Sequence, residues 1–230
     1  MFFWDPTYIL IIPAMLFALW AQSRVQGVFN TYSRVRARSG VSGAEAARHI
    51  LDGSGLDSVR IEQIPGRLQD HYDPRAKVLR LSPEVYGGSS LAALGVAAHE
   101  TGHAIQHANG YVPLAIRSSL VPVATFGSNL AFPLFLIGFI FAGSGLDWLM
   151  TLGIWLFVGA VAFSVVTLPV EYDASRRALA LLERGGYLSG EELRHTRQVL
   201  SAAGMTYLAA TAVAVTQLLR LLILRGSRRD

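Results

Sequence analysis

Long apolar stretches alternate with polar segments along this chain of 230 residues. Four stretches stand out, and they cover residues 7–21, 120–142, 146–170 and 205–224. A helix needs about 20 mainly apolar residues to cross a bilayer. The first stretch is short and contains Pro13, and the second contains Pro122 and Pro133, which spanning helices tolerate where they face protein. The pattern predicts a mainly α-helical, integral-membrane bundle of about four spans.

The first stretch has two interpretations. A cleaved signal peptide would have a basic segment before its apolar part and a small-residue cleavage motif after it, and neither is found before Arg24. The aromatic residues Trp4, Tyr8 and Trp20 are typical of anchors at a membrane surface. We therefore expect residues 1–22 to form a retained transmembrane anchor.

Only a Gly-Ser-Gly sequence at 143–145 separates the second and third stretches, which predicts a tight antiparallel hairpin over 120–170. A hairpin returns the chain to the membrane face that it left. The polar regions 23–119 and 171–200 are therefore expected on one side of the membrane. Residues 201–230 are expected to form a C-terminal transmembrane helix with a basic tail.

Short helices and strands are predicted in the polar region before the hairpin, which is therefore expected to be a small α+β domain. Ser42 followed by Glu45 is a capping-box pattern that opens a helix, and Gly53 can close it. Branched residues predict two strands, one around Val59 and one over Lys77 to Leu81. Because an extended substrate can pair with a strand, Lys77 to Leu81 is a candidate for that pairing. An ordinary edge strand is at least as good an interpretation.

Composition and charge indicate a membrane protein with one modest polar domain. Apolar residues make up 52% of the chain and charged residues only 16%. The net charge is +4, and sixteen of the 20 Lys and Arg residues lie in 21–119 and 171–200, which places these regions in the cytoplasm. The tail conflicts with this rule, because four crossings put Arg225, Arg228 and Arg229 outside. The positive charge favours anionic lipids, and no basic run interleaved with aromatic residues indicates nucleic acid.

A further helix is predicted over Ser90 to Ala108, and it contains the sequence His99-Glu100-Thr101-Gly102-His103. The four-residue spacing puts both imidazoles on one helical face, one turn apart, where they can share a zinc ion. Glu100 would take a proton from a water molecule whose pKa zinc lowers from ~16 toward ~7. The H-E-x-x-H pattern also occurs by chance. Here its neighbours are small and apolar, so the helix is expected to be buried, where polar side chains need partners.

Two residues compete for the third ligand position. His107 lies ~12 Å beyond His99 along a straight helix, which is too far for one tetrahedral ion. We expect it beside a ligand or the substrate, or as an ordinary structural histidine. Glu171 is the better candidate, because it opens a polar helical segment directly after the third apolar stretch. Since the chain has no cysteine, two histidines and one glutamate would hold one zinc ion per chain and leave a position for water.

Longer strings around these residues resemble a known family. Residues 70–75, 79–86, 95–107 and 168–171 are similar to the YugP-type membrane zinc metallopeptidases, and the likeness covers nearly the whole chain. More distantly, the order of motif helix, membrane hairpin and Glu-led helix is similar to HtpX-type membrane peptidases. The resemblance implies a zincin-like domain with His99, His103 and Glu171 as zinc ligands. It also implies that Glu100 is the general base.

Several polar residues close to these in sequence could contact the ligands or the substrate: His71, His107, Ser175, Arg176 and Arg177. Ser175 stands where the distant relatives usually have aspartate, which would orient a ligand histidine more strongly than a hydroxyl. His71 could polarise the scissile carbonyl or stabilise a turn. The two arginines could pair with Glu171, with Asp173 or with lipid headgroups.

The expected function is that of a multi-pass enzyme of the cell membrane. A zinc-dependent endopeptidase would hydrolyse peptide or protein substrates near the cytoplasmic face. The alternative is a non-catalytic membrane adaptor with a structural zinc site, but such a site has no use for Glu100 and usually fills all four ligand positions. A metal transporter is a weaker alternative, because the histidines cluster outside the apolar spans.

Overall fold

The computed structural model describes residues 6–227. Trp4 of the expected aromatic anchors and Arg228 and Arg229 of the basic tail lie outside the described residues. The chain divides into two compact units, and each is described by itself. The helical unit comprises the described residues within 1–21, 115–168 and 206–230, and the polar unit comprises 22–114 and 169–205.

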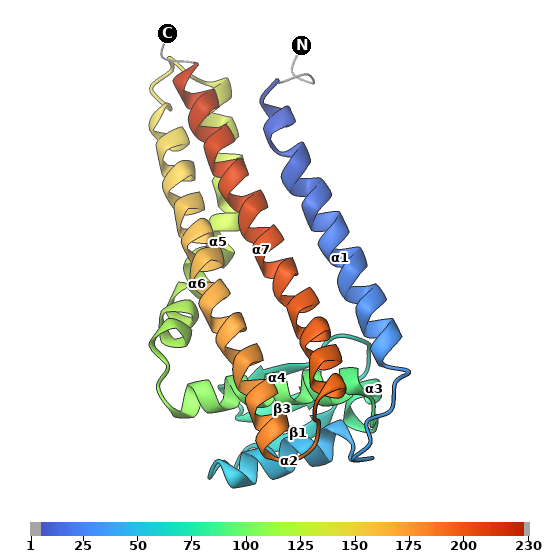
Figure 1. Ribbon diagram of the computed structural model, residues 1–230. Coiled ribbons are helices and arrows are strands. Elements are labelled where there is room, and N and C mark those ends of the chain that lie inside the picture. The colour runs from blue at the N-terminus through green and yellow to red at the C-terminus, as the bar shows by residue number, and fades with distance from the viewer. Residues whose placement is uncertain (1–5, 228–230) are drawn as a thin grey trace. The chain divides into compact units, whose positions relative to one another are not determined.

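Long helices form the helical unit (Figure 1). A short 3-10 helix, η1 (Pro6–Leu10), precedes α1 (Ile12–Tyr32), and three longer helices occur later: α5 (Val112–Ile140), α6 (Trp148–Arg184) and α7 (Glu191–Gly226). Residues 22–32 of α1, 169–184 of α6 and 191–205 of α7 belong to the polar unit. Within the described part of the chain, α5, α6 and α7 are long and apolar enough to cross a membrane. The mainly helical fold is thus confirmed. The span expected over 7–21 is not among these three helices.

The hairpin between α5 and α6 is present as predicted. Gly143 and Gly145 in its turn have φ values of 87° and 82°, which residues with a side chain rarely adopt. The two helices pack closely, because a Cβ added at Gly153 of α6 would lie 2.5 Å from the Ala131 carbonyl oxygen of α5. A small buried cluster joins α5, α6 and α7, and it contains Phe135, Met150, Ile154 and Leu221.

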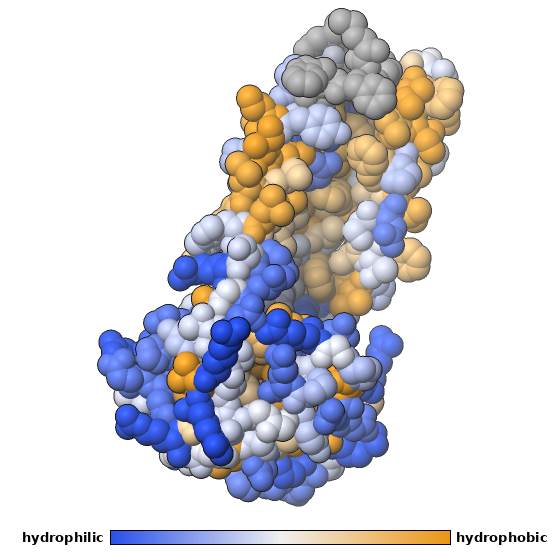
Figure 2. Space-filling model, turned by 90° about the vertical axis from the view of Figure 1, so that its right-hand side faces the viewer, coloured by the Kyte–Doolittle hydropathy of each residue, from blue (hydrophilic) through white to orange (hydrophobic). Residues whose placement is uncertain are grey.

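The outer surfaces of the two units differ in character. Figure 2 shows apolar residues gathered over the helices of the helical unit and polar residues covering most of the visible polar unit. Phe126 on α5 and Trp155 on α6 are among the most exposed large apolar residues, at 64% and 68%. Apolar side chains exposed in such numbers are typical of a surface that faces lipid.

The polar unit contains a mixed sheet of three strands in the order β1-β3-β2. β1 (Arg60–Gln63) is parallel to β3 (Val78–Leu81), and β2 (His71–Asp73) is antiparallel to it. The two predicted strands are confirmed, and β2 is an additional strand. Both interpretations of Lys77 to Leu81 are wrong, because β3 is the central strand and is hydrogen-bonded on both sides. It is therefore neither an edge strand nor free to pair with a substrate.

Three helices accompany this sheet, namely α2 (Gly43–Gly53), α3 (Pro83–Tyr86) and α4 (Leu91–Ala108). α4 packs against β2 and β3, and α2 and α3 pack against α4. The capping box of α2 is confirmed, since Ser42 Oγ accepts from the Glu45 N–H and the Glu45 carboxylate accepts from the Ser42 N–H. Buried residues of α2, β3 and α4 form one core that includes Leu51, Leu79 and Ala97. This core fixes α4 against the sheet.

Candidate metal centre

The helix that contains the H-E-x-x-H motif begins and ends as predicted. Ser90 is the N-cap of α4, and its hydroxyl oxygen accepts a hydrogen bond from the Ala93 N–H at 3.1 Å. Most of α4 is buried, because small apolar residues allow its neighbours to approach closely. His99 and His103 lie one turn apart, with a distance of 4.8 Å between their ring centroids. The four-residue spacing therefore brings the two imidazoles together.

α6 brings Glu171 to the same place. The Glu171 side chain is only 2% exposed, and its Oε2 lies 3.2 Å from His99 Nε2 and 3.5 Å from His103 Nε2. The close approach of α4 and α6 depends on Gly102, where an added Cβ would lie 2.9 Å from the Ala174 carbonyl oxygen. A larger residue at this position would separate the helices that supply the three side chains.

The three side chains form a group that could hold a metal ion. Each offers one ligand atom, and the three atoms lie within 4.8 Å of one another. Two imidazole nitrogens and one carboxylate oxygen are the donor set of many catalytic zinc sites, which leave a fourth position open. The buried carboxylate supplies negative charge that a cation would balance. The residues present therefore fit a zinc ion.

Glu100 lies beside this group and faces the edge of the sheet. Its Oε2 accepts a hydrogen bond of 3.0 Å from the Tyr72 backbone N–H on β2. Burial raises the pKa of the Glu100 carboxyl. For His103, burial alone would lower the pKa, but the hydrogen bond with Glu171 and the charges of Glu100 and Glu171 raise it overall. A cation at this site would compete with the proton that these groups favour.

Each of the two histidines has a hydrogen-bond partner on its other ring nitrogen. Ser175 Oγ lies 3.1 Å from His99 Nδ1, and Gln106 Oε1 lies 3.0 Å from His103 Nδ1. Such partners hold a ligand ring in one orientation. The structure thus brings Ser175 to the ligands. Sequence reasoning missed Gln106, although its position three residues after His103 puts both on one helical face.

The two arginines after Glu171 contact a different carboxylate. Both Arg176 and Arg177 place a guanidinium nitrogen 2.5 Å from a carboxylate oxygen of Asp173, which is itself nearly buried. Of the partners considered from the sequence, both arginines thus contact Asp173. Arg177 also lies over the ring of Tyr111, with its guanidinium carbon 5.7 Å from the ring centroid.

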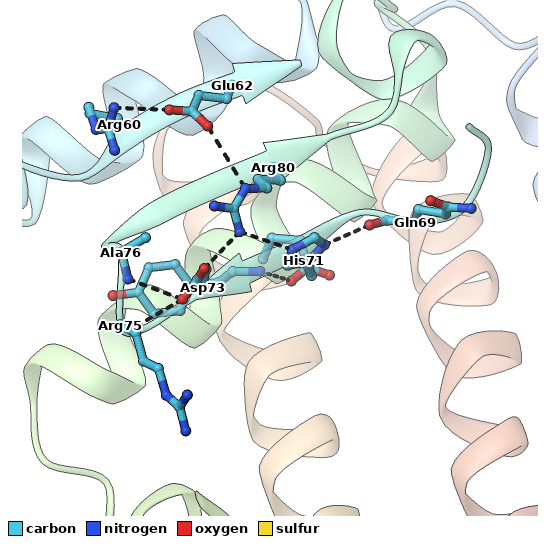
Figure 3. Close-up of polar contacts among 10 residues, drawn as sticks. Arg60, Glu62, Gln69, His71, Asp73, Arg75, Ala76 and Arg80 are labelled. Atoms are coloured by element: carbon cyan, nitrogen blue, oxygen red, sulfur yellow. Dashed lines mark hydrogen bonds and ion pairs between the residues drawn. The ribbon is translucent and has the colours of Figure 1, made fainter. Parts of the chain in front are cut away.

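Two further candidate histidines lie apart from the group of three. His107 Nδ1 is 3.0 Å from the Tyr72 hydroxyl. His71 Nδ1 is 2.8 Å from the Gln69 carbonyl oxygen, and its Nε2 is 3.5 Å from Arg80 on β3 (Figure 3). Tyr72 therefore contacts both Glu100 and His107, whereas His71 belongs to the polar network of the sheet.

A ladder of charged side chains holds β2 in the sheet (Figure 3). Arg80 Nη1 on β3 lies 2.7 Å from Asp73 Oδ2 on β2, and Arg80 Nε lies 3.8 Å from Glu62 Oε2 on β1. Asp73 also accepts hydrogen bonds from the N–H groups of Arg75 and Ala76, which form the turn after β2. The Ala76 N–H and the Arg80 guanidinium lower the pKa of Asp73 to about 2. The edge strand beside Glu100 is thus fixed on both sides of Tyr72.

Comparison with known proteins identifies the family. Residues 7–226 match the family model described as "Putative neutral zinc metallopeptidase". The chain belongs to this zinc metallopeptidase family. It is also 45% identical over 221 residues to "Putative membrane protease YugP" of Bacillus subtilis (strain 168), and the match covers 96% of this chain and 97% of that protein. No solved structure matches the chain. The resemblance to the YugP-type membrane zinc metallopeptidases is confirmed.

Proposed function

We propose that this chain is a multi-pass membrane endopeptidase that requires zinc and uses Glu100 as its general base. The observation that carries the proposal is the convergence of His99, His103 and Glu171 from two helices, with the Glu100 carboxylate beside them. Membership of a zinc metallopeptidase family and similarity to a membrane protease support it.

In this proposal His99 and His103 would hold the ion through Nε2, and Glu171 would hold it through a carboxylate oxygen. A zinc ion held there would supply Lewis acidity to a water molecule and to the scissile carbonyl group. Glu100 removes a proton from the attacking water and delivers it to the leaving amine. The Tyr72 N–H holds the Glu100 carboxylate in place, and burial raises the pKa of this carboxyl.

We propose the edge strand β2 as the element that aligns the substrate. In an antiparallel pair, successive residues point their N–H and C=O groups alternately toward and away from the partner strand. The Tyr72 N–H points to Glu100 and donates to it, so the Tyr72 carbonyl is on the same free edge and can accept from a substrate. An extended peptide whose N–H donates to this carbonyl would pass beside Glu100. His107, hydrogen-bonded to the Tyr72 hydroxyl, is then close to the substrate.

We propose that the polar unit lies in the cytoplasm and that four spans cross the plasma membrane, α1 being the fourth. The many arginines in 21–119 and 171–200 support this orientation. Because the chain has no cysteine, a single exposed cysteine can report the side directly. In intact cells, Arg75→Cys should resist a membrane-impermeant thiol reagent and react after lysis. Labelling of intact cells would place the polar unit outside.

Cleavage of an unfolded reporter protein by detergent-purified full-length protein tests the catalytic proposal. Glu100→Gln should retain zinc and lose cleavage by ~100-fold or more, because the amide cannot accept the proton. Glu84→Gln is a matched control, since Glu84 is a half-exposed carboxylate paired with Arg67. It should cleave like the wild type. Undiminished zinc-dependent cleavage by Glu100→Gln would refute the assignment, and zinc binding without cleavage by any form would favour the adaptor.

A further inference from the structure

Gln106 is a fully buried polar residue that the proposed chemistry does not use. It is 0% exposed and lies one helical turn after His103 on α4. Its Oε1 is 3.0 Å from His103 Nδ1, and its Nε2 donates to the Val170 carbonyl oxygen and to Asp173 Oδ2, both at 2.9 Å. Burial of an amide is costly unless its polar atoms are hydrogen-bonded, so these three contacts account for its position.

The orientation of the amide follows from its partners. The Val170 carbonyl and the Asp173 carboxylate are both acceptors, so the NH2 group of Gln106 must face them. Oε1 then faces His103 and can only accept a hydrogen bond. Nδ1 of His103 must therefore carry the hydrogen. The lone pair on Nε2 of His103 remains available to a metal, and this is the atom that lies 3.5 Å from Glu171.

The Asp173 carboxylate is itself held by Arg176 and Arg177, each at 2.5 Å. A charged acceptor binds the NH2 group more strongly than a neutral one, so it fixes the amide of Gln106. Many metal sites place a carboxylate directly on the ligand histidine. Here an amide lies between the carboxylate and the ring. The amide can orient the ring but cannot take its Nδ1 proton.

The same amide joins the two helices that supply the ligands. Val170 directly precedes Glu171 on α6, and its carbonyl is bound by the side chain of a residue on α4. Gln106 therefore contacts the ligand His103 on its own helix, α4. It also contacts the backbone beside the ligand Glu171 on α6. Displacement of this amide would change the distance between His103 and Glu171.

We propose that Gln106 is a positioning residue of the metal centre. It holds His103 in the tautomer that has its hydrogen on Nδ1 and presents Nε2 to the ion, and it sets the position of Glu171 relative to α4. This inference rests on the proposed zinc site. It predicts a loss of metal affinity when Gln106 is replaced, whether or not a substrate is present.

Zinc affinity of the purified full-length protein, measured by competition with a chromogenic chelator, tests this role. Gln106→Met keeps the length of the side chain but removes its donors and its acceptor, and we expect a 10–100-fold loss of affinity. Thr101→Val is the matched control, because Thr101 is equally buried on α4 and its hydroxyl donates only to the Ala97 carbonyl. The control should bind zinc like the wild type. Equal affinities for all three proteins would overturn the inference.

Nitrogen-15 NMR of the wild type decides the matter if Gln106→Met does not fold. In zinc-loaded protein with labelled histidine, His103 should show a slowly exchanging proton on Nδ1 and none on Nε2. A proton-free Nδ1 would overturn the inference. If the wild type binds no zinc, the proposed function itself fails, whereas equal zinc affinity in the wild type and Gln106→Met contradicts only the role of Gln106.

Discussion

Gly102→Ala is expected to weaken the metal centre by separating the two helices that form it. The added Cβ would lie 2.9 Å from the Ala174 carbonyl oxygen and 3.3 Å from its Cα, and these backbone atoms cannot rotate away. Ordinary contacts of this kind begin at 3.4 Å, so α4 and α6 must move apart by about 0.5 Å. Overpacking of this kind costs about 1–3 kcal/mol, against a gain of about 1 kcal/mol in helix propensity.

A displacement of about 0.5 Å is also the limit that a binding constellation tolerates. We therefore expect Gly102→Ala to bind zinc ~10-fold or more weakly, by the same chelator competition, and to unfold at a lower temperature in detergent. Gly27→Ala in α1 is the matched control, because a Cβ there meets nothing within 4 Å. It should keep the zinc affinity and gain slightly in stability. The reasoning is refuted if Gly102→Ala binds zinc like the wild type and is stabilised like Gly27→Ala.

Three further predictions concern residues around the centre. Ser175→Ala removes the partner of His99 Nδ1 and should weaken zinc binding ~10-fold in the chelator assay. Ser175→Asp should restore the zinc affinity. Unchanged affinity in both variants would contradict the contact. Ser42→Ala removes the cap of α2 and should cost about 1 kcal/mol in thermal unfolding, with no change in zinc affinity. The pKa of Asp73 is lowered to about 2, so its stabilising effect is present above pH 4 and is lost as the pH falls toward 2. Asp73→Asn should therefore reduce the loss of unfolding free energy that the wild type shows between pH 4 and pH 2. An unchanged loss over this range would exclude a stabilising role for the Asp73 carboxylate.

Features that depend on neighbours in sequence were predictable. The capping box of α2, the bounds of α4 and the hairpin turn are confirmed, because caps, periodicity and glycine turns act over a few residues. The convergence of Glu171 with the two histidines also follows the expectation. That expectation needed only a hairpin that returns the chain to the membrane face that it left.

Features that depend on distant pairing were not predictable from the sequence. β2 has only three residues, too few for an alternating pattern, and its place in the sheet is set by pairing with β3 and by the Arg80 ladder. The strand order also excludes β3 as the strand that pairs with a substrate, because β3 is central in the sheet. Gln106 gave a signal only through its spacing from His103, since Val170 and Asp173 are more than 60 residues away.

The dependence of cleavage on bound zinc tests the central claim most directly. Full-length protein is stripped with a chelator, dialysed and titrated with zinc, and cleavage of an unfolded reporter is followed together with the zinc content. The account predicts no cleavage by the stripped protein and full recovery at one zinc ion per chain. Cleavage that persists without zinc, or that does not return when zinc is bound, would contradict it.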